Sequence, residues 1–146
     1  MDIETDLNST FIWLVGLHLE AENRTYSFYA DTPEHEKQIL SELIQFLTAR
    51  RDLSLLSYSG CRIEERMLAQ RLAAHGLANE IASSIRDLYF DIHSCFAFPT
   101  QALTLKEVAK SCGFTWRDSG MDGFAVAALY GRRGRLAKQR KQMVIR

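Results

Sequence analysis

The chain opens on carboxylates whose spacing could bind a metal ion. Asp2 and Glu4 flank Ile3, and Thr5 and Asp6 follow directly. If this stretch is a strand, side chains alternate between its faces, so Asp2 and Glu4 share one face about 6 to 7 Å apart while Ile3 enters the other. Hard carboxylate oxygens of this kind select Mg²⁺ or Mn²⁺ rather than zinc. The opening therefore predicts two metal ligands on a first strand.

Hydrophobic periodicity predicts three successive strands that present these acids. Residues 11–19 are nearly continuously apolar, as expected of a strand buried on both faces. Residues 24–30 then alternate, with Tyr26, Phe28 and Ala30 on one face. Together with the opening stretch, we expect these segments to form three antiparallel strands.

Helix signals follow the third strand. Thr32 and Pro33 mark the start of a first helix, and a second helix is expected over about residues 62–75, with Gly76 as its stop. A fourth strand is expected at residues 53–58, a short helix at 77–85, a fifth strand at 86–92, a helix capped by Thr104 and Glu107, and a last helix from near Asp122. This order predicts an α/β fold, in which a mixed five-stranded sheet is covered by helices.

Composition favours a single domain over residues 1–146. The chain is 47% hydrophobic and 25% charged, which suits one globular domain with a real core. Cys61, Cys95 and Cys112 form no CxxC pair and follow no signal peptide, so we expect a reduced, cytoplasmic protein. The longest apolar run is far shorter than the roughly 20 residues of a membrane span, which argues against a membrane protein.

A formal net charge of zero conceals an uneven distribution. No acid follows Asp122, whereas residues 131–146, here called the basic segment, carry only cations: Arg132, Arg133, Arg135, Lys138, Arg140, Lys141 and Arg146. Such a segment beside an acidic site suits an enzyme that acts on a polyanion, and we assign phosphate contacts to all of these cations but Arg146. A solvated helix or frayed tail is the alternative.

Several stretches together resemble a known family. They are DIE at the first strand, YSGCRIEERML after the fourth strand, and TLKEVAKSCGFTW followed by DGFAVAALY. From Asp2 to about Tyr130, the chain resembles the ribonuclease-H-like domain of predicted RecB-type nucleases, a branch similar to the DEDD 3′-to-5′ exonucleases. The resemblance implies hydrolysis of nucleic-acid phosphodiesters by two metal ions about 3.5 to 4 Å apart.

The resemblance also implies a role for individual residues. Asp2 would bridge two Mg²⁺ or Mn²⁺ ions, Glu4 would be a second ligand, and Glu64, at the start of the second helix, would be the third acid. Tyr58 and Ser59 would line the groove in which a nucleotide lies. The alternatives are that Asp2 and Glu4 are solvated, and that Glu64 only favours a helix N-terminus through the helix dipole.

Other polar and aromatic side chains have a simpler structural interpretation. We interpret His93 as a partly buried structural histidine, and Asp87 and Asp91 as solvated acids at the end of a strand. Trp13 and Trp116 are interpreted as core residues.

Two features separate the chain from the family it resembles. Only Met1 precedes Asp2, where the family has several apolar residues, and the family's last acidic motif has no counterpart after Asp122. Asp118 or Asp122 could stand in for the missing fourth acid, although both fall early. We therefore expect an exonuclease domain trimmed at both ends, with activity weakened or lost.

Three functional hypotheses follow from these features. The first is a metal-dependent nuclease domain, the second a catalytically inactive nucleic-acid-binding module, and the third a truncated remnant without independent activity. Nucleic acid, either DNA or RNA, is the expected partner. A helicase or other nuclease-associated domain is a further candidate.

Overall fold

A computed structural model describes residues 1–116, 127, 128 and 130 of the chain. Three strands form an antiparallel sheet in the order β1-β2-β3, with bounds β1 Asp2–Thr5, β2 Ile12–Leu19 and β3 Arg24–Tyr29. In the register of β1 on β2, Asp2 lies opposite Gly16 and Glu4 opposite Leu14. The three antiparallel strands expected from the sequence are therefore confirmed.

The remaining two described strands form a separate parallel pair. β4 Leu55–Ser57 runs beside β5 Ile85–Asp87, and the chain crosses between them through α2 Ile63–Ala74. A hydrogen bond of 2.5 Å from the Met1 nitrogen to the Leu56 carbonyl oxygen joins the start of β1 to β4. The antiparallel and parallel parts of the expected sheet are both present, although they form two sheets rather than one ladder of five strands.

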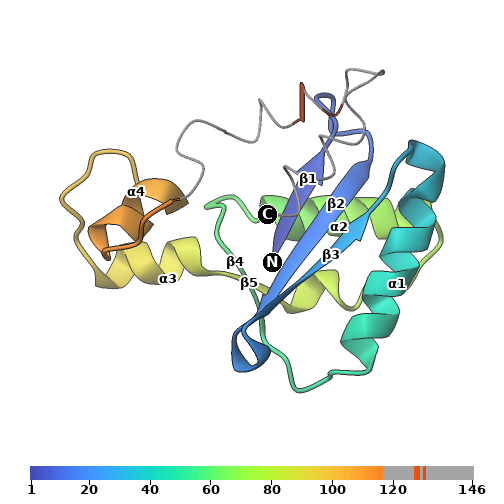
Figure 1. The fold of residues 1–146 in the computed structure, drawn as a ribbon, viewed down its shortest axis with the longest axis horizontal. Helices are drawn as coiled ribbons and strands as arrows, with labels where there is room; N and C mark the ends of the chain where they lie inside the picture. Colours follow the sequence, from blue (N-terminus) through green and yellow to red (C-terminus); the bar gives the residue numbers. More distant parts are fainter. Residues whose placement is uncertain (117–126, 129, 131–146) are drawn as a thin grey trace.

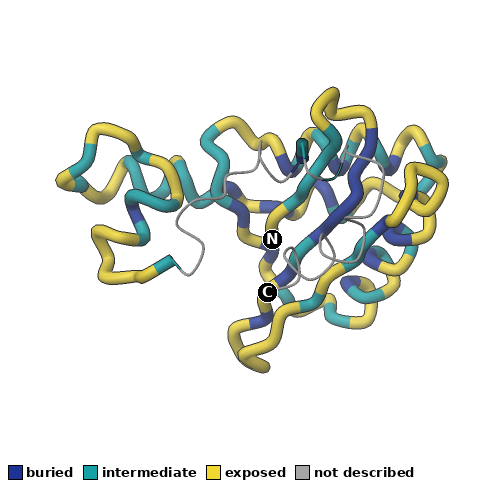
Figure 2. The backbone as a smooth tube through the Cα atoms, turned by 45° about the horizontal axis from the view of Figure 1, so that its top comes forward, coloured by how far each residue is buried: buried dark blue, intermediate teal, exposed yellow. Residues whose placement is uncertain are grey.

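Two helices bury one face of the strands. α1 Glu36–Thr48 follows a 3-10 turn at Pro33–His35, and α1 and α2 both contribute to the main hydrophobic core. Figure 2 shows the buried stretches of backbone running through the strands and the helices beside them. The most buried contributors to this core include Ile12, Val15, Leu17, Leu40, Leu43, Leu68 and Leu72.

Two further helices lie at one end of the molecule. α3 Leu88–Cys95 and α4 Leu105–Ser111 extend beyond the strands, on the side away from α1 (Figure 1). The Thr104 side chain caps α4 by accepting a hydrogen bond of 3.3 Å from the Glu107 nitrogen, as the sequence predicted. Short 3-10 turns at Glu20–Glu22 and Ala82–Ser84 complete the described elements. No helix in the described part of the chain is long and apolar enough to cross a membrane.

The structure corrects the sequence prediction around the fifth strand. The strand predicted over residues 86–92 ends at Asp87, and α3 begins at the next residue because the Asp87 carboxylate accepts a hydrogen bond from the Tyr89 nitrogen at 3.0 Å and caps the helix. The helix predicted over residues 77–85 is only the 3-10 turn Ala82–Ser84. Thr32 and Pro33 occupy the N-cap and first positions of the 3-10 turn that leads into α1, as predicted, although the Thr32 side chain makes no capping hydrogen bond. The start of the helix predicted from near Asp122 lies outside the described residues, and the described residues 127, 128 and 130 are helical.

Candidate active site

The two acids of β1 occupy one face of the strand, as its alternation requires. Ile3 packs against the main core, whereas Asp2 is exposed and Glu4 is partly buried opposite Leu14. Burial raises the pKa of Glu4 to about 7, and the nearby charge of Asp2 adds to the shift. The two carboxylates are therefore close enough to repel each other, which makes their shared face favourable for a cation.

Glu64 is the second residue of α2 and is only 9% exposed. Its Oε2 atom is buried and has no hydrogen-bond partner among the described residues. Burial lowers the pKa of the Met1 α-amino group, while the charges of Asp2 and Glu64 act in the opposite direction. Asp2 and Glu64 therefore lie within electrostatic reach of the same nitrogen atom, although they are far apart in the sequence.

The structure does not show Asp2, Glu4 and Glu64 as one cluster of metal ligands. Within residues 1–116 and the three described residues beyond them, no group of three His, Cys, Asp or Glu side chains could hold a metal ion. The structure thus relates Asp2 to Glu4 and Asp2 to Glu64 in pairs, and the three-carboxylate metal site stays a prediction.

The third acid of the opening has a structural role. Asp6 accepts hydrogen bonds from the Thr10 nitrogen at 2.5 Å, the Thr10 hydroxyl at 2.9 Å and the Phe11 nitrogen at 3.1 Å. Burial raises the pKa of Asp6, but these hydrogen bonds outweigh it and the pKa lies below its usual value. Asp6 therefore holds the turn between β1 and β2, which fixes the register that places Asp2 and Glu4.

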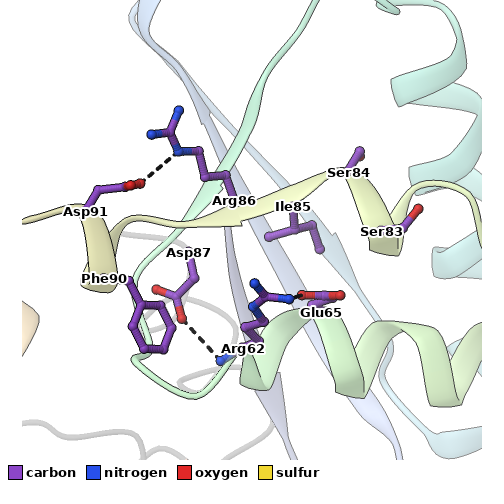
Figure 3. A pocket seen from close by; sticks show the side chains of 9 residues that line it. All are labelled: Arg62, Glu65, Ser83, Ser84, Ile85, Arg86, Asp87, Phe90 and Asp91. Carbon is purple, nitrogen blue, oxygen red and sulfur yellow. Dashed lines mark hydrogen bonds and ion pairs between the residues drawn. The ribbon is translucent and has the colours of Figure 1, made fainter.

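Asp87, interpreted from the sequence as a solvated acid, is instead 8% exposed at the end of β5. Its carboxylate accepts hydrogen bonds from the Ser59, Gly60, Arg62 and Tyr89 nitrogens and from the Ser59 hydroxyl. Figure 3 shows it facing the Arg62 backbone. The signal that could have revealed this role is an Asp directly before an apolar segment able to form a helix, which is a capping pattern. By contrast, Asp91 forms an exposed ion pair with Arg86.

Comparison with protein families identifies the fold. A profile described as the RNase H superfamily matches residues 1–141. The chain belongs to the RNase H superfamily. No curated protein and no solved structure shows a significant match to it. Membership agrees with the observed α/β arrangement and supports a nuclease-like function on nucleic acid.

RNase H-superfamily nucleases typically use divalent metal ions, and the acids of this chain fit such ions chemically. All three candidate ligands are carboxylates, the donors that Mg²⁺ and Mn²⁺ prefer. A cation would provide a partner for the buried Glu64 Oε2 atom and would oppose the rise in the pKa of Glu4, which is caused mainly by burial and secondly by the charge of Asp2. The roles of Glu4 and Glu64 as metal ligands stay predictions, and these two features are the observations that bear on them.

The polar groups of Tyr58 and Ser59 are engaged within this RNase H-like fold. The Tyr58 hydroxyl donates to the Leu103 carbonyl oxygen at 2.9 Å and lies 3.4 Å from His93 Nε2. Both the nitrogen and the hydroxyl of Ser59 donate to Asp87. Their predicted contact with a nucleotide stays a prediction. His93 is half-buried and stacks on another aromatic ring, so its structural interpretation is confirmed.

The two tryptophans differ in burial. Trp13 is fully buried, and its ring stacks on that of Tyr130 at 4.7 Å between centroids. Tyr130 also donates a hydrogen bond of 2.9 Å to the carbonyl oxygen of Ala30, the residue after β3. Trp116 is only half-buried, and its Nε1 atom donates to the Lys106 carbonyl oxygen. Trp13 is therefore a core residue as predicted, while Trp116 is not.

The remaining predicted site residues cannot be placed. The two possible substitutes for the fourth acid and the predicted phosphate-binding cations lie outside the described residues: Asp118, Asp122, Arg132, Arg133, Arg135, Lys138, Arg140 and Lys141.

A cavity of about 450 Å³ lies next to Asp87, between the start of α2 and the start of α3 (Figure 3). Two arginines line the cavity, and each forms an ion pair with an acid. Arg62 Nη1 lies 3.8 Å from Glu65 Oε2, and Arg86 Nε lies 2.8 Å from Asp91 Oδ2. Because each cation has an acidic neighbour, the cavity carries no excess positive charge for a phosphate.

Proposed function

We propose that this RNase H-superfamily chain is a metal-dependent nuclease domain that hydrolyses nucleic-acid phosphodiesters in the manner of the RecB-type and DEDD 3′-to-5′ exonucleases. The observation that carries the proposal is the buried Glu64 Oε2 atom without a partner among the described residues, on a side chain that shares an electrostatic neighbour with Asp2. A buried carboxylate oxygen without a partner is costly unless something binds it.

Each of the three acids has a defined part in this proposal. Asp2 would bridge two Mg²⁺ or Mn²⁺ ions, and Glu4 and Glu64 would each bind one side of the pair. Bound ions would supply an activated water and neutralise the leaving oxygen. Because its pKa is about 7, the Glu4 carboxyl carries a proton in a substantial fraction of molecules at neutral pH, and it must release that proton before it can bind an ion.

The strand arrangement supports convergence of the acids. We infer that β1 lies beside β4 in one mixed five-stranded sheet, and the hydrogen bond from the Met1 nitrogen to the Leu56 carbonyl oxygen supports this pairing. Since α2 follows directly after β4 and its loop, such pairing would bring the start of α2 close to β1. Asp2 and Glu64 would then meet at one edge of the sheet.

The lack of an established fourth acidic ligand limits the expected rate of cleavage. Three carboxylates should hold one ion adequately and the second poorly, unless Asp118 or Asp122 supplies another ligand. We therefore propose weak cleavage by this chain, with the basic segment contributing phosphate contacts and a helicase or other nuclease-associated domain as a candidate companion. The exposed free thiols of Cys61, Cys95 and Cys112 are consistent with a reduced, cytoplasmic setting.

A catalytically inactive nucleic-acid-binding module is the second candidate. It is favoured by the finding that the described residues contain no ready group of three metal ligands. Such a module would bind nucleic acid with strong salt dependence and would not cleave it.

End-labelled single-stranded oligonucleotides test the proposal. The chain is incubated with Mn²⁺ or with a chelator, alongside the variants Asp2→Asn, Glu64→Gln and the control Asp91→Asn, which alters an exposed acid that pairs with Arg86. We expect weak Mn²⁺-dependent cleavage that is lost in the first two variants and kept in the control. Brisk cleavage that survives Asp2→Asn would place the site elsewhere, and binding without any cleavage would favour the inactive module.

A further inference from the structure

The loop between β4 and α2 folds around a single buried carboxylate. Asp87 Oδ2 accepts from the Gly60 nitrogen at 2.9 Å, the Arg62 nitrogen at 3.2 Å and the Ser59 hydroxyl at 3.0 Å. Asp87 Oδ1 accepts from the Ser59 nitrogen at 3.1 Å and the Tyr89 nitrogen at 3.0 Å. One side chain from β5 thus accepts hydrogen bonds from Ser59, Gly60 and Arg62, in a loop that comes more than twenty residues earlier in the chain.

This loop needs external support because its backbone is unfavourable. Arg62 has a φ of 50°, in the left-handed region that residues other than glycine rarely adopt, whereas Gly60 takes its φ of 76° without steric cost. The Tyr89 ring closes over Gly60, where an added Cβ atom would lie 3.0 Å from the ring. The Asp87 carboxylate and the Tyr89 ring therefore hold the loop in a conformation that it would not keep alone.

The same loop leads directly into the residue proposed to bind metal. The Ser59 hydroxyl donates to Asp87 and also accepts a hydrogen bond of 3.2 Å from the nitrogen of Ile63, the first residue of α2. Glu64 is the next residue. Asp87 is thus connected through one hydroxyl group to the first turn of the helix that carries Glu64.

We propose that Asp87 is a positioning residue that sets the start of α2 and thereby aims the Glu64 carboxylate toward the face occupied by Asp2. Its own oxygens are occupied by five protein donors, so it acts through the loop and not as a metal ligand. The part of this inference that concerns metal rests on the proposed function. The part that concerns the orientation of Glu64 does not.

Two variants separate this role from general stability. Asp87→Asn keeps the size of the side chain but replaces one acceptor oxygen with a donor group, which cannot accept from the loop nitrogens. Ser59→Ala removes the hydroxyl that joins Asp87 to Ile63, and with it both of its hydrogen bonds, but keeps the hydrogen bond from the Ser59 nitrogen to Asp87. Asp91→Asn is the matched control, since the Asp91 carboxylate pairs with the exposed side chain of Arg86.

The measurements use the isotope-labelled full chain. Amide hydrogen exchange at Gly60, Ile63 and Glu64 reports on the loop and the start of α2 without any metal. Line broadening of the Glu64 amide by added Mn²⁺ reports the affinity of the ion near that residue, and thermal melting reports global stability.

We expect exchange at these amides to rise at least tenfold in Asp87→Asn, and Mn²⁺ affinity to fall by about tenfold, the usual loss when a residue supporting a metal ligand is changed. Ser59→Ala should shift both quantities in the same direction by less, and the control should leave both unchanged. Unchanged exchange at Ile63 and Glu64 in both variants would overturn the inference. So would Mn²⁺ affinities equal to that of the unmodified chain.

The measurements distinguish failure of the proposed nuclease function from failure of the proposed role of Asp87. If the unmodified chain does not bind Mn²⁺, the metal-dependent nuclease is refuted, and amide exchange alone then decides whether Asp87 positions Glu64. If Asp87→Asn does not fold, Ser59→Ala decides: faster exchange at Ile63 and Glu64 without a matching loss of melting temperature supports the inference, and unchanged exchange overturns it.

Discussion

Replacement of Glu36 should test how the helices that frame the candidate site are held together. Its carboxylate, 1% exposed at the start of α1, accepts hydrogen bonds from the Ile12 nitrogen at 2.6 Å, from Arg71 Nε at 2.8 Å and Nη2 at 2.6 Å, and from His75 Nε2 at 2.7 Å. One side chain thus joins β2, α1 and the C-terminal half of α2, the helix that carries Glu64 at its other end.

Glu36→Gln should be strongly destabilising because it removes the negative charge that pairs with Arg71. Breaking a buried ion pair typically costs about 3 to 5 kcal/mol. The Gln amide oxygen can still accept part of the set, and Arg71 is 19% exposed, so we expect the lower end, about 3 kcal/mol. With a urea dependence of about 2 kcal/mol per M, the midpoint of urea unfolding should fall by about 1.5 M.

The pH dependence of stability gives a second check. Burial raises the pKa of Glu36, but the hydrogen bonds from Arg71, His75 and the Ile12 nitrogen outweigh it, so the folded pKa lies below the usual 4.5. A carboxyl with a depressed folded pKa contributes stability that is present above its unfolded pKa and lost as pH falls through the folded value. The original chain should therefore lose stability relative to Glu36→Gln as pH drops below about 4.5.

The double variant Glu36→Leu with Arg71→Met serves as the control for an unpaired buried charge. Removal of both charged partners should cost less than Glu36→Gln, because no buried cation is left without its anion. A urea midpoint within 0.3 M of the original chain for Glu36→Gln, or a double variant less stable than the single one, would refute this account of the cluster.

Three further predictions concern the loop, the site and the basic segment. Gly60→Ala should lower the melting temperature more than Gly113→Ala. Both positions have a left-handed φ, of 76° and 86°, but of the two only Gly60 faces a ring, because a Cβ atom added there would lie 3.0 Å from the Tyr89 ring. Equal losses in melting temperature would contradict a role for that contact. In metal-free solution the Glu4 carboxyl should titrate near pH 7 by carbon NMR, and Asp2→Asn should lower that midpoint. The free energy of unfolding should fall as pH rises from 4.5 through 7, because the folded state holds the Glu4 proton more tightly than the unfolded state does. A Glu4 midpoint near 4.5 would contradict burial of the site. Deletion of the basic segment should weaken nucleic-acid binding and flatten its salt dependence, and an unchanged salt slope would exclude phosphate contacts there.

The elements that the sequence predicted well are those with a strong local period. Alternation at Asp2, Ile3 and Glu4 correctly gave the face of each side chain, because the period of two in a strand holds whatever lies around it. The same reasoning failed after Arg86, where the apolar residues of the RDLYFDI stretch suit a strand or a helix equally well. The capping hydrogen bond from the Tyr89 nitrogen to Asp87 decides for the helix.

What the sequence could not give is the environment of each acid. Sequence analysis gave Glu36 no role and interpreted Asp87 as a solvated acid; the capping pattern marks Asp87 as the start of a helix, but no local feature shows that either acid is buried. Their burial depends on donors far away in the chain: Arg71 and His75 for Glu36, and the loop before α2 for Asp87. Such contacts follow only from the tertiary fold, so pattern and spacing alone are insufficient to predict them.

A comparison of the three buried carboxylates in the described part of the chain distinguishes structural acids from the functional candidate. Glu36 accepts four hydrogen bonds and Asp87 five, and both sets of donors come from the protein itself. Glu64 is equally removed from water, yet its Oε2 atom has no hydrogen-bond partner among the described residues. Burial of a carboxylate oxygen without a donor opposes folding, so a purely structural acid at this position would gain from a neighbouring donor, as the other two have. The Met1 α-amino group lies within electrostatic reach of Glu64, but no donor bonds to the Oε2 atom among the described residues, so we propose that a bound cation is its partner in this member of the RNase H superfamily.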